Sequence, residues 1–538
     1  MRTRLLVRKL LRVLAIKMRT TQLPEVTSRR CFFVLISTLG FLFVYNFYQV
    51  WKQSTGVHIR CDCGTKIETE ERVARYLNTL MNEVDSTTNR TAQDSILATH
   101  PSLAIDFLAQ QDSRGWRCSS TPGIFSVKHR NTIWQEAEVA RHTFLLYGAY
   151  YDDRDVAAGP LVRILVMVES TWPPTPTCHI WYENDVKPSA TRAVKIEYVH
   201  WQERLEEHWL PYVVSCRTRN NRTDVPKVVS IVNDACAPAT NALRIFHRTL
   251  SPKKDIALCH KFLFNPAKDF SLRLVEWIES LRAWGVDHLT VYEAASHPNV
   301  EKVLRHYQKQ GFLTVLPWAN PGSQPQLPHL YRLLYDTQRY TLFTDENIPY
   351  TDCLLRSIGT HRFVGIWDID EFILPVSHGS LPEMLEAAEA KASAQGMRPT
   401  SYLARCTYYF DDQAEVPTAE LPGYLHMLRH ITRTVKYSPP RSHTKAFHDT
   451  SRALGLHAHF ALLNLEGPVD REHQLYSLYP GDEAHLAHYR YQCQGENQTE
   501  CREIYRPFLI RDATVWKHKE EVASNTRDVL LKLRLMPP

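Results

Sequence analysis

The chain has 538 residues, of which 44% are hydrophobic and 11% aromatic, and its formal net charge is +6. A chain of this length and apolar content can bury a large core in two folded domains, which excludes a disordered or fibrous protein. Nine lysines and arginines and one acid lie in residues 1–30, so this tail carries +8 and the other 508 residues about −2. The folded part is therefore not basic, which argues against nucleic acid as a partner.

An apolar segment without charges follows this tail. Residues 31–51, CFFVLISTLGFLFVYNFYQVW, are long enough to cross a bilayer as a helix. A cleaved signal peptide is the alternative, but its apolar part is usually shorter and ends in small residues, whereas this segment ends with Tyr48 and Trp51 close together. We therefore predict a retained signal anchor, with residues 1–30 in the cytosol and the rest of the chain in a lumen.

The cysteines and glycosylation sequons agree with a lumenal location. Eleven of the twelve cysteines follow the apolar segment, and no pair of CxxC motifs suggests zinc, so disulfide bonds in an oxidising compartment are predicted. Because eleven is odd, one thiol is expected to stay free or to join two chains in a homodimer. Sequons at Asn89, Asn221 and Asn497 lie on the same side of the anchor and predict N-glycosylation.

Beyond the anchor, the sequence divides into three parts. Residues 52–117 are largely polar and are predicted to form a stem. Residues 118–250 contain short strand-like runs, such as TFLLYGAYYDD and LVRILVMVES, between clusters of Pro, Asp and Asn. Short strands without long helices predict a β-rich, sandwich-like accessory module. Residues 251–538 follow a different pattern and are predicted to be the catalytic domain.

Strands and helices alternate from Asp255 onward. The pattern predicts apolar strands and amphipathic helices in the order strand 256–264, helix 269–284, strand 287–294, helix 299–310 and strand 312–318. Short connections between such elements predict an α/β domain with a parallel sheet, whose ligands bind at the carboxyl ends of the strands. No GxGxxG motif or P-loop occurs at these turns, which disfavours a dinucleotide enzyme or a Walker-type kinase.

Two aspartates follow the next apolar strand, in the stretch FVGIWDIDEFILP. Alternation in an extended chain would direct Asp368 and Asp370 to the same side and Ile369 away from it. Two ionised carboxylates so close together repel each other unless a cation lies between them. A hard divalent cation such as Mn²⁺ or Mg²⁺ meets this need. Such an ion would also bind a diphosphate and neutralise the charge of the diphosphate as it leaves. The D-x-D pattern alone is weak, and its position after a strand strengthens it.

Several motifs between about Asp255 and Tyr505 resemble glycosyltransferase family 92 in their order and spacing: WDIDEFILP, LVEWIESLRAWGVDHLTVYE, VLRHYQKQGFLTVLPW, DCLLR, LGLH and AHYR. The resemblance implies a catalytic domain of the GT-A type in a type II Golgi membrane protein. It also implies an inverting, metal-dependent transfer of galactose from UDP-galactose to a hydroxyl group of a glycan acceptor, with formation of a β-linkage.

The resemblance also assigns roles to individual positions. Asp368 and Asp370 would bind the metal and the UDP moiety, and Glu371 would orient them or contact the donor. An imidazole is a suitable ligand for manganese, so His457 in LGLH is the predicted third ligand, with His459 as the alternative. Six further residues are candidates for contacts to the phosphates, sugar or ribose of the donor: Glu293, Arg356, Lys436, His488, Tyr489 and Arg490. Buried histidines and solvated charges are the ordinary alternatives at these positions.

Inverting transfer also needs a general base within reach of the acceptor hydroxyl. The adjacent Asp411 and Asp412, after the strand-like CTYYF, are the candidates, and Glu466 is another. The commoner family pattern has small residues at the place of the two aspartates, so a simple turn is the alternative to a catalytic role.

Three functions compete at this point. The first is an active galactosyltransferase. The second is a membrane-anchored glycan-binding protein or inactive relative, against which the intact Asp368 and Asp370 argue. The third is a phosphohydrolase of the D-x-D kind, whose usual motif has Thr or Val where this chain has Phe372. Mn²⁺-dependent hydrolysis or transfer of a UDP-sugar distinguishes the first function from the second. The third would form an aspartyl-phosphate intermediate that a phosphate analogue traps, and we expect no such trapping.

Overall fold

The computed structural model describes most of the chain after residue 95, in the ranges 96–97, 100–110, 121–155, 159–183, 185, 187–219, 224–413, 416–440, 442–465, 467–468, 476–493 and 498–536. These residues belong to one compact unit, Thr88–Pro538. The predicted anchor, most of the predicted stem and the asparagines of all three sequons lie outside the described residues. Within the described ranges, no helix combines the length and the apolar character needed to cross a bilayer.

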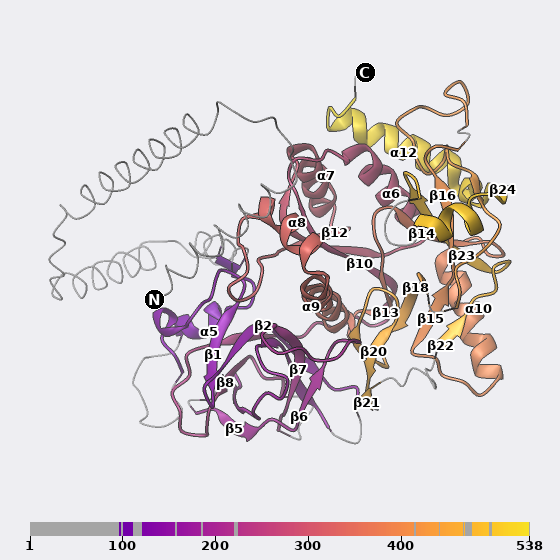
Figure 1. Cartoon of the computed structure of the whole chain (residues 1–538). Coiled ribbons are helices and arrows are strands. Elements are labelled where there is room, and N and C mark those ends of the chain that lie inside the picture. Colours follow the sequence, from indigo (N-terminus) through magenta and orange to yellow (C-terminus); the bar gives the residue numbers. More distant parts are fainter. Residues whose placement is uncertain are drawn as a thin grey trace, which may run out of the picture. The chain divides into compact units, whose positions relative to one another are not determined.

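The first part of this unit is a nine-stranded sheet, drawn in indigo to magenta in Figure 1. Its strands are β1 (Gln135–Val139), β2 (His142–Asp152), β3 (Leu161–Val168), β4 (Thr177–Trp181), β5 (Ser189–Arg192), β6 (Lys195–Tyr198), β7 (Leu210–Arg217), β8 (Val228–Val232) and β9 (Leu243–Phe246). The order is β5-β4-β8-β9-β2-β3-β7-β6, with β1 paired to β2. A disulfide joins Cys178 in β4 to Cys216 in β7, which are not neighbours in this order, so the sheet folds over a core of its own. The prediction of a β-rich region is confirmed.

Residues before this sheet also belong to the compact unit. The short helix α5 (Ile105–Gln110) lies within the range predicted to be stem, yet Leu103, Ile105 and Leu108 are buried against Trp181 and neighbouring residues of the sheet. The apolar spacing of these residues is weak in an otherwise polar segment, so the sequence pattern did not reveal this contact.

A second mixed sheet follows, with the order β12-β11-β10-β13-β18-β15-β22. Its first elements are β10 (Lys254–Asn265), α6 (Ser271–Ala283), β11 (His288–Ser296), α7 (Pro298–Lys309), β12 (Leu313–Pro317), α8 (Pro328–Thr337), α9 (Arg339–Ser357) and β13 (His361–Ile366). Strands β10 to β13 are parallel, as predicted. Gly285 and Gly311 follow α6 and α7 with φ of +93° and +76°, a conformation that favours glycine, and so they end these helices.

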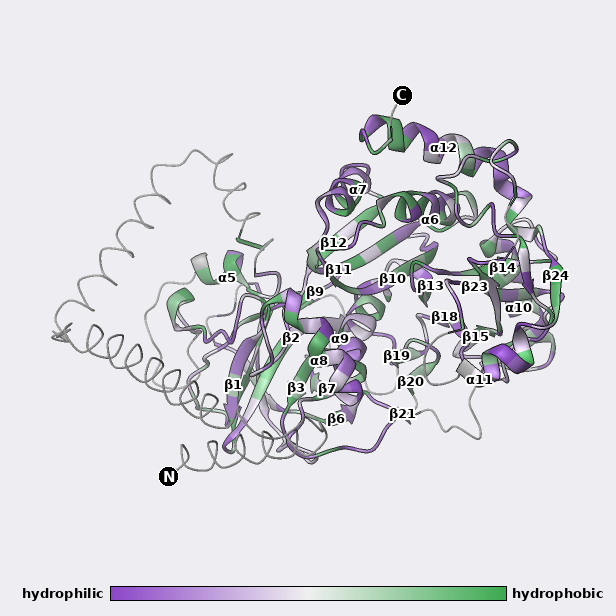
Figure 2. Cartoon of the chain, turned by 45° about the horizontal axis from the view of Figure 1, so that its top comes forward, coloured by the Kyte–Doolittle hydropathy of each residue, from purple (hydrophilic) through white to green (hydrophobic). Residues whose placement is uncertain are grey.

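Alternation along the strands places helices on both faces of this sheet. Ile256 and Leu258 of β10 pack with α6 and α7, whereas Ala257 and Cys259 face α9. Figure 2 shows apolar residues along β10 and β11 where these helices cover them. The β-rich sheet reaches the same core, because Leu165 of β3 packs with the α9 cluster. The two sheets therefore share a hydrophobic core.

The C-terminal part completes the domain with further sheets. The remaining elements are β14 (Glu371–Pro375), α10 (Leu381–Ala394), β15 (Ser401–Ala404), β16 (Cys406–Phe410), β17 (Thr432–Thr434), β18 (Lys445–Asp449), β19 (Ala453–Leu456), β20 (Ala461–Asn464), β21 (Gly467–Pro468), β22 (Tyr476–Leu478), β23 (Ala484–Arg490), α11 (Gln498–Glu500), β24 (Leu509–Arg511) and α12 (Lys519–Lys532). Strand β14 pairs antiparallel with β23, and Glu371 lies opposite His488. This register brings the HYR motif next to the D-x-D motif, about 120 residues earlier in the sequence.

Disulfide bonds are present, as predicted. Besides Cys178–Cys216, they join Cys259 to Cys353 and Cys493 to Cys501, and Cys236 is also disulfide-bonded. Among the described cysteines, Cys406 is free, and it is fully buried in β16. A buried thiol cannot reach a second chain without local unfolding, so Cys406 does not support the predicted disulfide-linked homodimer.

The Cys259–Cys353 bond is expected to stabilise the protein more than Cys493–Cys501 does. The first closes a loop with a sequence separation of 94 and the second one of 8. In the chain-entropy description, this difference in loop length corresponds to about 2 kcal/mol. Urea denaturation of the two double variants, Cys259→Ala/Cys353→Ala and Cys493→Ala/Cys501→Ala, measures it. Equal losses of unfolding free energy would show that loop length does not govern these bonds.

Candidate active site

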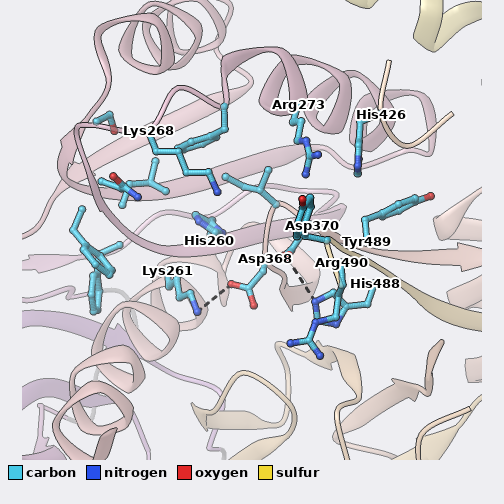
Figure 3. Close-up of a pocket in the computed structure, with 18 of the residues that line it drawn as sticks. His260, Lys261, Lys268, Arg273, Asp368, Asp370, His426, His488, Tyr489 and Arg490 are labelled. Atoms are coloured by element: carbon cyan, nitrogen blue, oxygen red, sulfur yellow. Dashed lines mark ion pairs between the residues drawn. The ribbon is translucent and has the colours of Figure 1, made fainter. Parts of the chain in front are cut away.

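A pocket of about 690 Å³ opens at the carboxyl end of β10 and β11. Its walls come from the end of β10, the start of α6, helix α8, the turn after β13, the segment around His426 and the end of β23. Figure 3 shows Asp368 and Asp370 in this pocket, with His488 and Arg490 beside them and Arg273 and His426 on the opposite wall. The predicted position of the ligand site, at the carboxyl ends of parallel strands, agrees with this pocket.

The two aspartates reach the pocket by a different route from the one predicted. Strand β13 ends at Ile366, and the Glu371 N–H donates a hydrogen bond of 3.0 Å to the Asp368 carbonyl. Residues 368–371 therefore form a tight turn rather than an extended strand. Both carboxylates line the pocket, but Ile369 lines it too, so the alternation argument was wrong.

The cations nearest to Asp368 are two lysines. Lys445 Nζ lies 3.1 Å from one carboxylate oxygen of Asp368, and Lys261 Nζ lies 3.4 Å from the other. Burial by itself would raise the pKa of Asp368, but the charges of Lys261 and Lys445 outweigh it and hold this pKa well below its usual range. The chain itself therefore neutralises Asp368, the role that the sequence prediction gave to a metal ion.

Asp370 is placed differently, because its side chain is 52% exposed to the pocket. Its carboxylate lies 3.5 Å from Nε2 of His488. Burial would lower the pKa of His488, but its hydrogen bond to Asp370 outweighs this and raises the pKa well above the usual value. The pairing of β14 with β23, in which Glu371 lies opposite His488, brings the two groups together.

Asp370 and, once its ring has lost the proton, His488 fit a divalent cation as ligands. A carboxylate oxygen and an imidazole nitrogen are both ligand types that Mn²⁺ accepts, and their 3.5 Å separation suits two ligands of one ion. Asp368 has lone pairs beyond the two that face the lysines, so it could also contribute a ligand to such a site. The imidazole in the donor set fits manganese better than magnesium, which prefers oxygen ligands.

Glu371 lies behind the pocket rather than in it. It is buried, and one of its oxygens lies 2.8 Å from Lys445 Nζ and accepts a 3.1 Å hydrogen bond from the Asp368 N–H. Burial raises its pKa, and the charge of Lys445 acts in the opposite direction. Glu371 therefore orients the turn, as one of its two predicted roles requires, and does not contact the pocket.

The predicted ligand His457 is not among the residues that line the pocket. Its N–H bonds to the Phe460 carbonyl in the turn after β19, and its ring packs against Trp201 and His459. The alternative, His459, is also held, because its Nδ1 lies 2.7 Å from the Thr444 carbonyl. The histidine that faces Asp370 is His488, which the sequence prediction assigned to the donor phosphates.

Three predicted donor contacts lie away from the pocket. Arg356 forms an ion pair of 2.8 Å with buried Asp352, which also accepts a hydrogen bond from Tyr292. This network joins the two sheets and has a structural role. Lys436 is exposed and lies 5.2 Å from the Phe508 ring. Glu293 lies 4.0 Å from Arg305 on α7. His488, Tyr489 and Arg490 do line the pocket.

The predicted bases are both paired with cations. Asp411 lies 2.8 Å from Arg273 and 2.9 Å from Nε2 of His426. Burial would raise the pKa of Asp411, but these two partners outweigh it and hold the pKa well below its usual range. Asp412 forms an ion pair with Arg506. A carboxylate with such a low pKa is a poor proton acceptor, so Asp411 does not suit the base role directly. Glu466 lies outside the described residues.

Sequence reasoning missed several residues of this site, among them Lys261, Lys445 and His426. Lys261 interrupts the apolar run of β10, which was a usable signal, because a charge inside a strand needs a partner. Lys445 and His426 lie in segments without a motif, and only the fold brings Lys445 to Asp368 and His426 to the pocket.

The fold and the pocket define a mixed α/β enzyme whose site holds carboxylates among several cations. The profile described as Glycosyltransferase family 92 matches residues 254–526, just over half of the chain. The chain therefore belongs to glycosyltransferase family 92 and is a glycosyltransferase. Among curated proteins, it is 22% identical over 253 residues to "Beta-1,4-galactosyltransferase galt-1" of Caenorhabditis elegans, a match that covers 45% of this chain and 53% of that protein. The chain thus spans about half the length of this relative.

Two solved structures are similar to part of the chain. "Crystal structure of S. aureus TarS 1-349" covers 37% of this chain and 47% of that one, with 15% identity and a TM-score of 0.20. "Crystal structure of 4-diphosphocytidyl-2C-methyl-D-erythritol synthase" covers 37% and 76%, with 12% identity and a TM-score of 0.18. At these scores, neither structure adds to the assignment.

Proposed function

We propose that this glycosyltransferase is an inverting, metal-dependent enzyme of the GT-A type that transfers galactose from UDP-galactose to a hydroxyl group of a glycan. The observation that carries the proposal is the pair of Asp370 and His488, which open on a pocket lined by several cations. The name of the nematode relative supports galactose as the sugar and a β-linkage as the product. The predicted anchor supports a place in the Golgi membrane with the catalytic part in the lumen.

The charges of the pocket suit a nucleoside diphosphate. Lys261, Lys268 and Arg490 all line it, and guanidinium and ammonium groups are the usual partners of phosphate oxygens. Asp370 and His488 would hold the divalent ion, which supplies Lewis-acid stabilisation of the charge that develops on the diphosphate. Lys445 and Lys261 keep Asp368 ionised and fixed, so the turn is already in place before the donor binds. Phe262 and Phe264 provide apolar surface at the β10 end of the pocket.

The test is a screen of UDP-sugars with the full-length chain. We expect release of UDP from UDP-galactose to be at least about tenfold faster than from UDP-glucose or UDP-N-acetylglucosamine. A site that hydrogen-bonds a hydroxyl group of galactose would bind a sugar without that group in the same position less well in the transition state. EDTA should stop the reaction and Mn²⁺ should restore it. Turnover that persists in EDTA would contradict the metal, and faster turnover of another UDP-sugar would contradict galactose. A glycan array with the preferred donor then identifies the acceptor.

A further inference from the structure

A histidine and an aspartate form a hydrogen-bonded pair on the wall of the pocket opposite Asp370. His426 lines the pocket, and its Nε2 lies 2.9 Å from Oδ1 of Asp411. In Figure 3, the His426 side chain points from the upper wall into the space above Asp370 and Tyr489. The other oxygen of Asp411 accepts a 2.8 Å hydrogen bond from Arg273. The pair belongs neither to the turn of the D-x-D motif nor to the HYR motif.

The hydrogen bond to Asp411 fixes the tautomer of His426. An ionised carboxylate can only accept hydrogen bonds, so Nε2 must carry the proton. Nδ1 of the neutral ring then keeps its lone pair and can accept a proton. A carboxylate that orients an imidazole also stabilises the imidazolium that forms when the ring takes up a proton. Asp411 suits this second role because His426 and Arg273 keep it ionised.

The segment that carries His426 is held rigidly. The carboxylate of Glu276, which is completely buried in α6, accepts hydrogen bonds from the backbone N–H groups of His426, Met427 and Leu428, at 2.5 to 3.0 Å. The His426 ring also lies 5.6 Å from the ring of Tyr489, centroid to centroid. Burial of a carboxylate costs free energy unless the carboxylate accepts hydrogen bonds, and here these come from three backbone N–H groups. Movement of the segment would break these bonds, so the position of His426 is well defined.

Tyr489 connects the two walls of the pocket. Its N–H donates a 2.9 Å hydrogen bond to the Asp370 carbonyl, while its ring contacts His426. His426 and Asp370 thus line different walls of one pocket, whose volume is about 690 Å³. In the proposed reaction, the sugar would extend from the diphosphate toward His426, and the acceptor would bind on the side of the histidine.

A second metal ion is the alternative use of this cluster. Asp411, His426 and His430 each offer a ligand atom, and these atoms lie within 4.8 Å of one another. The guanidinium of Arg273, however, already contacts Asp411 at 2.8 Å, and a divalent cation beside it would be repelled. The charges therefore favour a proton acceptor at His426 over a metal site.

We propose that His426 is the general base of the transfer reaction and that Asp411 is its positioning residue. The proposal rests on the proposed function. Nδ1 of His426 takes the proton of the acceptor hydroxyl as its oxygen forms a bond to C1 of the sugar. The bond from C1 to the diphosphate oxygen breaks, and its electron pair leaves with UDP. The proton on His426 then passes to solvent, which completes the balance of acceptor and UDP-sugar to glycoside, UDP and a proton.

The test uses His426→Ala and His426→Gln in the full-length chain, with the donor and acceptor found by the screen and array. General-base catalysis contributes about 10² to 10⁴, so kcat is expected to fall at least about a hundredfold in both variants, while the Kd for UDP by calorimetry stays within about twofold. His426→Gln keeps a hydrogen-bond donor for Asp411 and guards against misfolding. Added imidazole should restore the kcat of His426→Ala at least about tenfold, because only a missing proton acceptor can be supplied from solution.

Further variants distinguish general-base catalysis by His426 from the alternative roles. Asp411→Asn should lower kcat at least about tenfold without changing UDP binding, since it loses the correct tautomer. His329→Ala, an exposed position on α8, is the control and should match the wild type. Wild-type kcat in His426→Gln, a loss that imidazole does not rescue, or a large loss only in Asp412→Asn would overturn the proposal. If instead the unaltered chain turns over no UDP-sugar, the proposed function itself fails, and the two failures are thus distinguishable.

Discussion

Asp370→Asn is expected to lower sugar transfer about a thousandfold and to leave the protein folded. Stabilisation of a developing charge by a metal ion is worth several kcal/mol, and each 1.36 kcal/mol corresponds to a factor of ten in rate. The amide is a much weaker metal ligand and carries no charge. Because the Asp370 side chain is 52% exposed and faces one histidine, the loss of unfolding free energy should stay below about 1 kcal/mol. Turnover is measured over a Mn²⁺ titration, and folding by urea denaturation.

A matched substitution controls for the change of charge. Asp482→Asn makes the same chemical change at an exposed position before β23, outside the pocket, and should behave as wild type. If Asp370→Asn turned over donor at the wild-type rate at limiting Mn²⁺, Asp370 would not be a metal ligand. A large loss of stability in Asp370→Asn would instead assign this aspartate a structural role.

Local patterns were sufficient to predict the elements that form the pocket. The alternation of β10, α6, β11, α7 and β12 follows from apolar spacing and two glycines, and such signals lie within one element and its ends. The D-x-D motif could be located because it interrupts an apolar run, and a polar group in such a place needs a partner. These are properties of short segments, which sequence periodicity reports directly.

The partners of these residues could not be predicted, because they are set by strand pairing. Lys445 reaches Asp368 only because β18 pairs antiparallel with β13, with Phe447 opposite Gly365. His488 reaches Asp370 through the β14–β23 register. His457 directly follows the apolar strand β19, and His488 lies within the strand β23. The two local sequences do not show which of these histidines reaches the D-x-D motif. The tight turn that ends at Glu371 also decides which side chains face the pocket. A turn longer by one residue would reverse the side to which each following side chain points.

The same geometry explains how a charged turn is tolerated in the core. Asp368, Glu371, Lys261 and Lys445 alternate in sign, with separations of 2.8 to 3.4 Å. Lys261 also contacts buried Glu346 at 3.1 Å. A buried charge is stable only when it is paired, so each member of this network depends on the others. The network fixes the turn that presents Asp370 to the pocket, which links the stability of the core to the proposed catalytic site.

Lys445→Met should therefore destabilise the protein strongly. The Lys445 side chain is 1% exposed and neutralises both Asp368 and Glu371. Removal of one partner from a buried ion pair costs about 3 to 5 kcal/mol, and we expect about 3 kcal/mol because Lys261 still faces Asp368. Lys391→Met is the control: Lys391 is 54% exposed and lies 2.8 Å from Glu483, so its loss should cost less than about 1 kcal/mol. Urea denaturation of both variants at pH 7 gives the two values.

The destabilisation by Lys445→Met should also depend on pH. In the wild type, Lys445 and Lys261 hold the pKa of Asp368 well below its unfolded value. Such a group stabilises the folded state above the unfolded pKa, near 4, and this contribution is lost as the pH falls through the folded pKa. The variant lacks much of this contribution because the pKa of Asp368 rises when Lys445 is removed. The difference in unfolding free energy between the two proteins should thus be largest near neutral pH and should shrink below about pH 4. A difference that stays constant from pH 7 to pH 3 would attribute the loss to packing around the Lys445 side chain rather than to its charge.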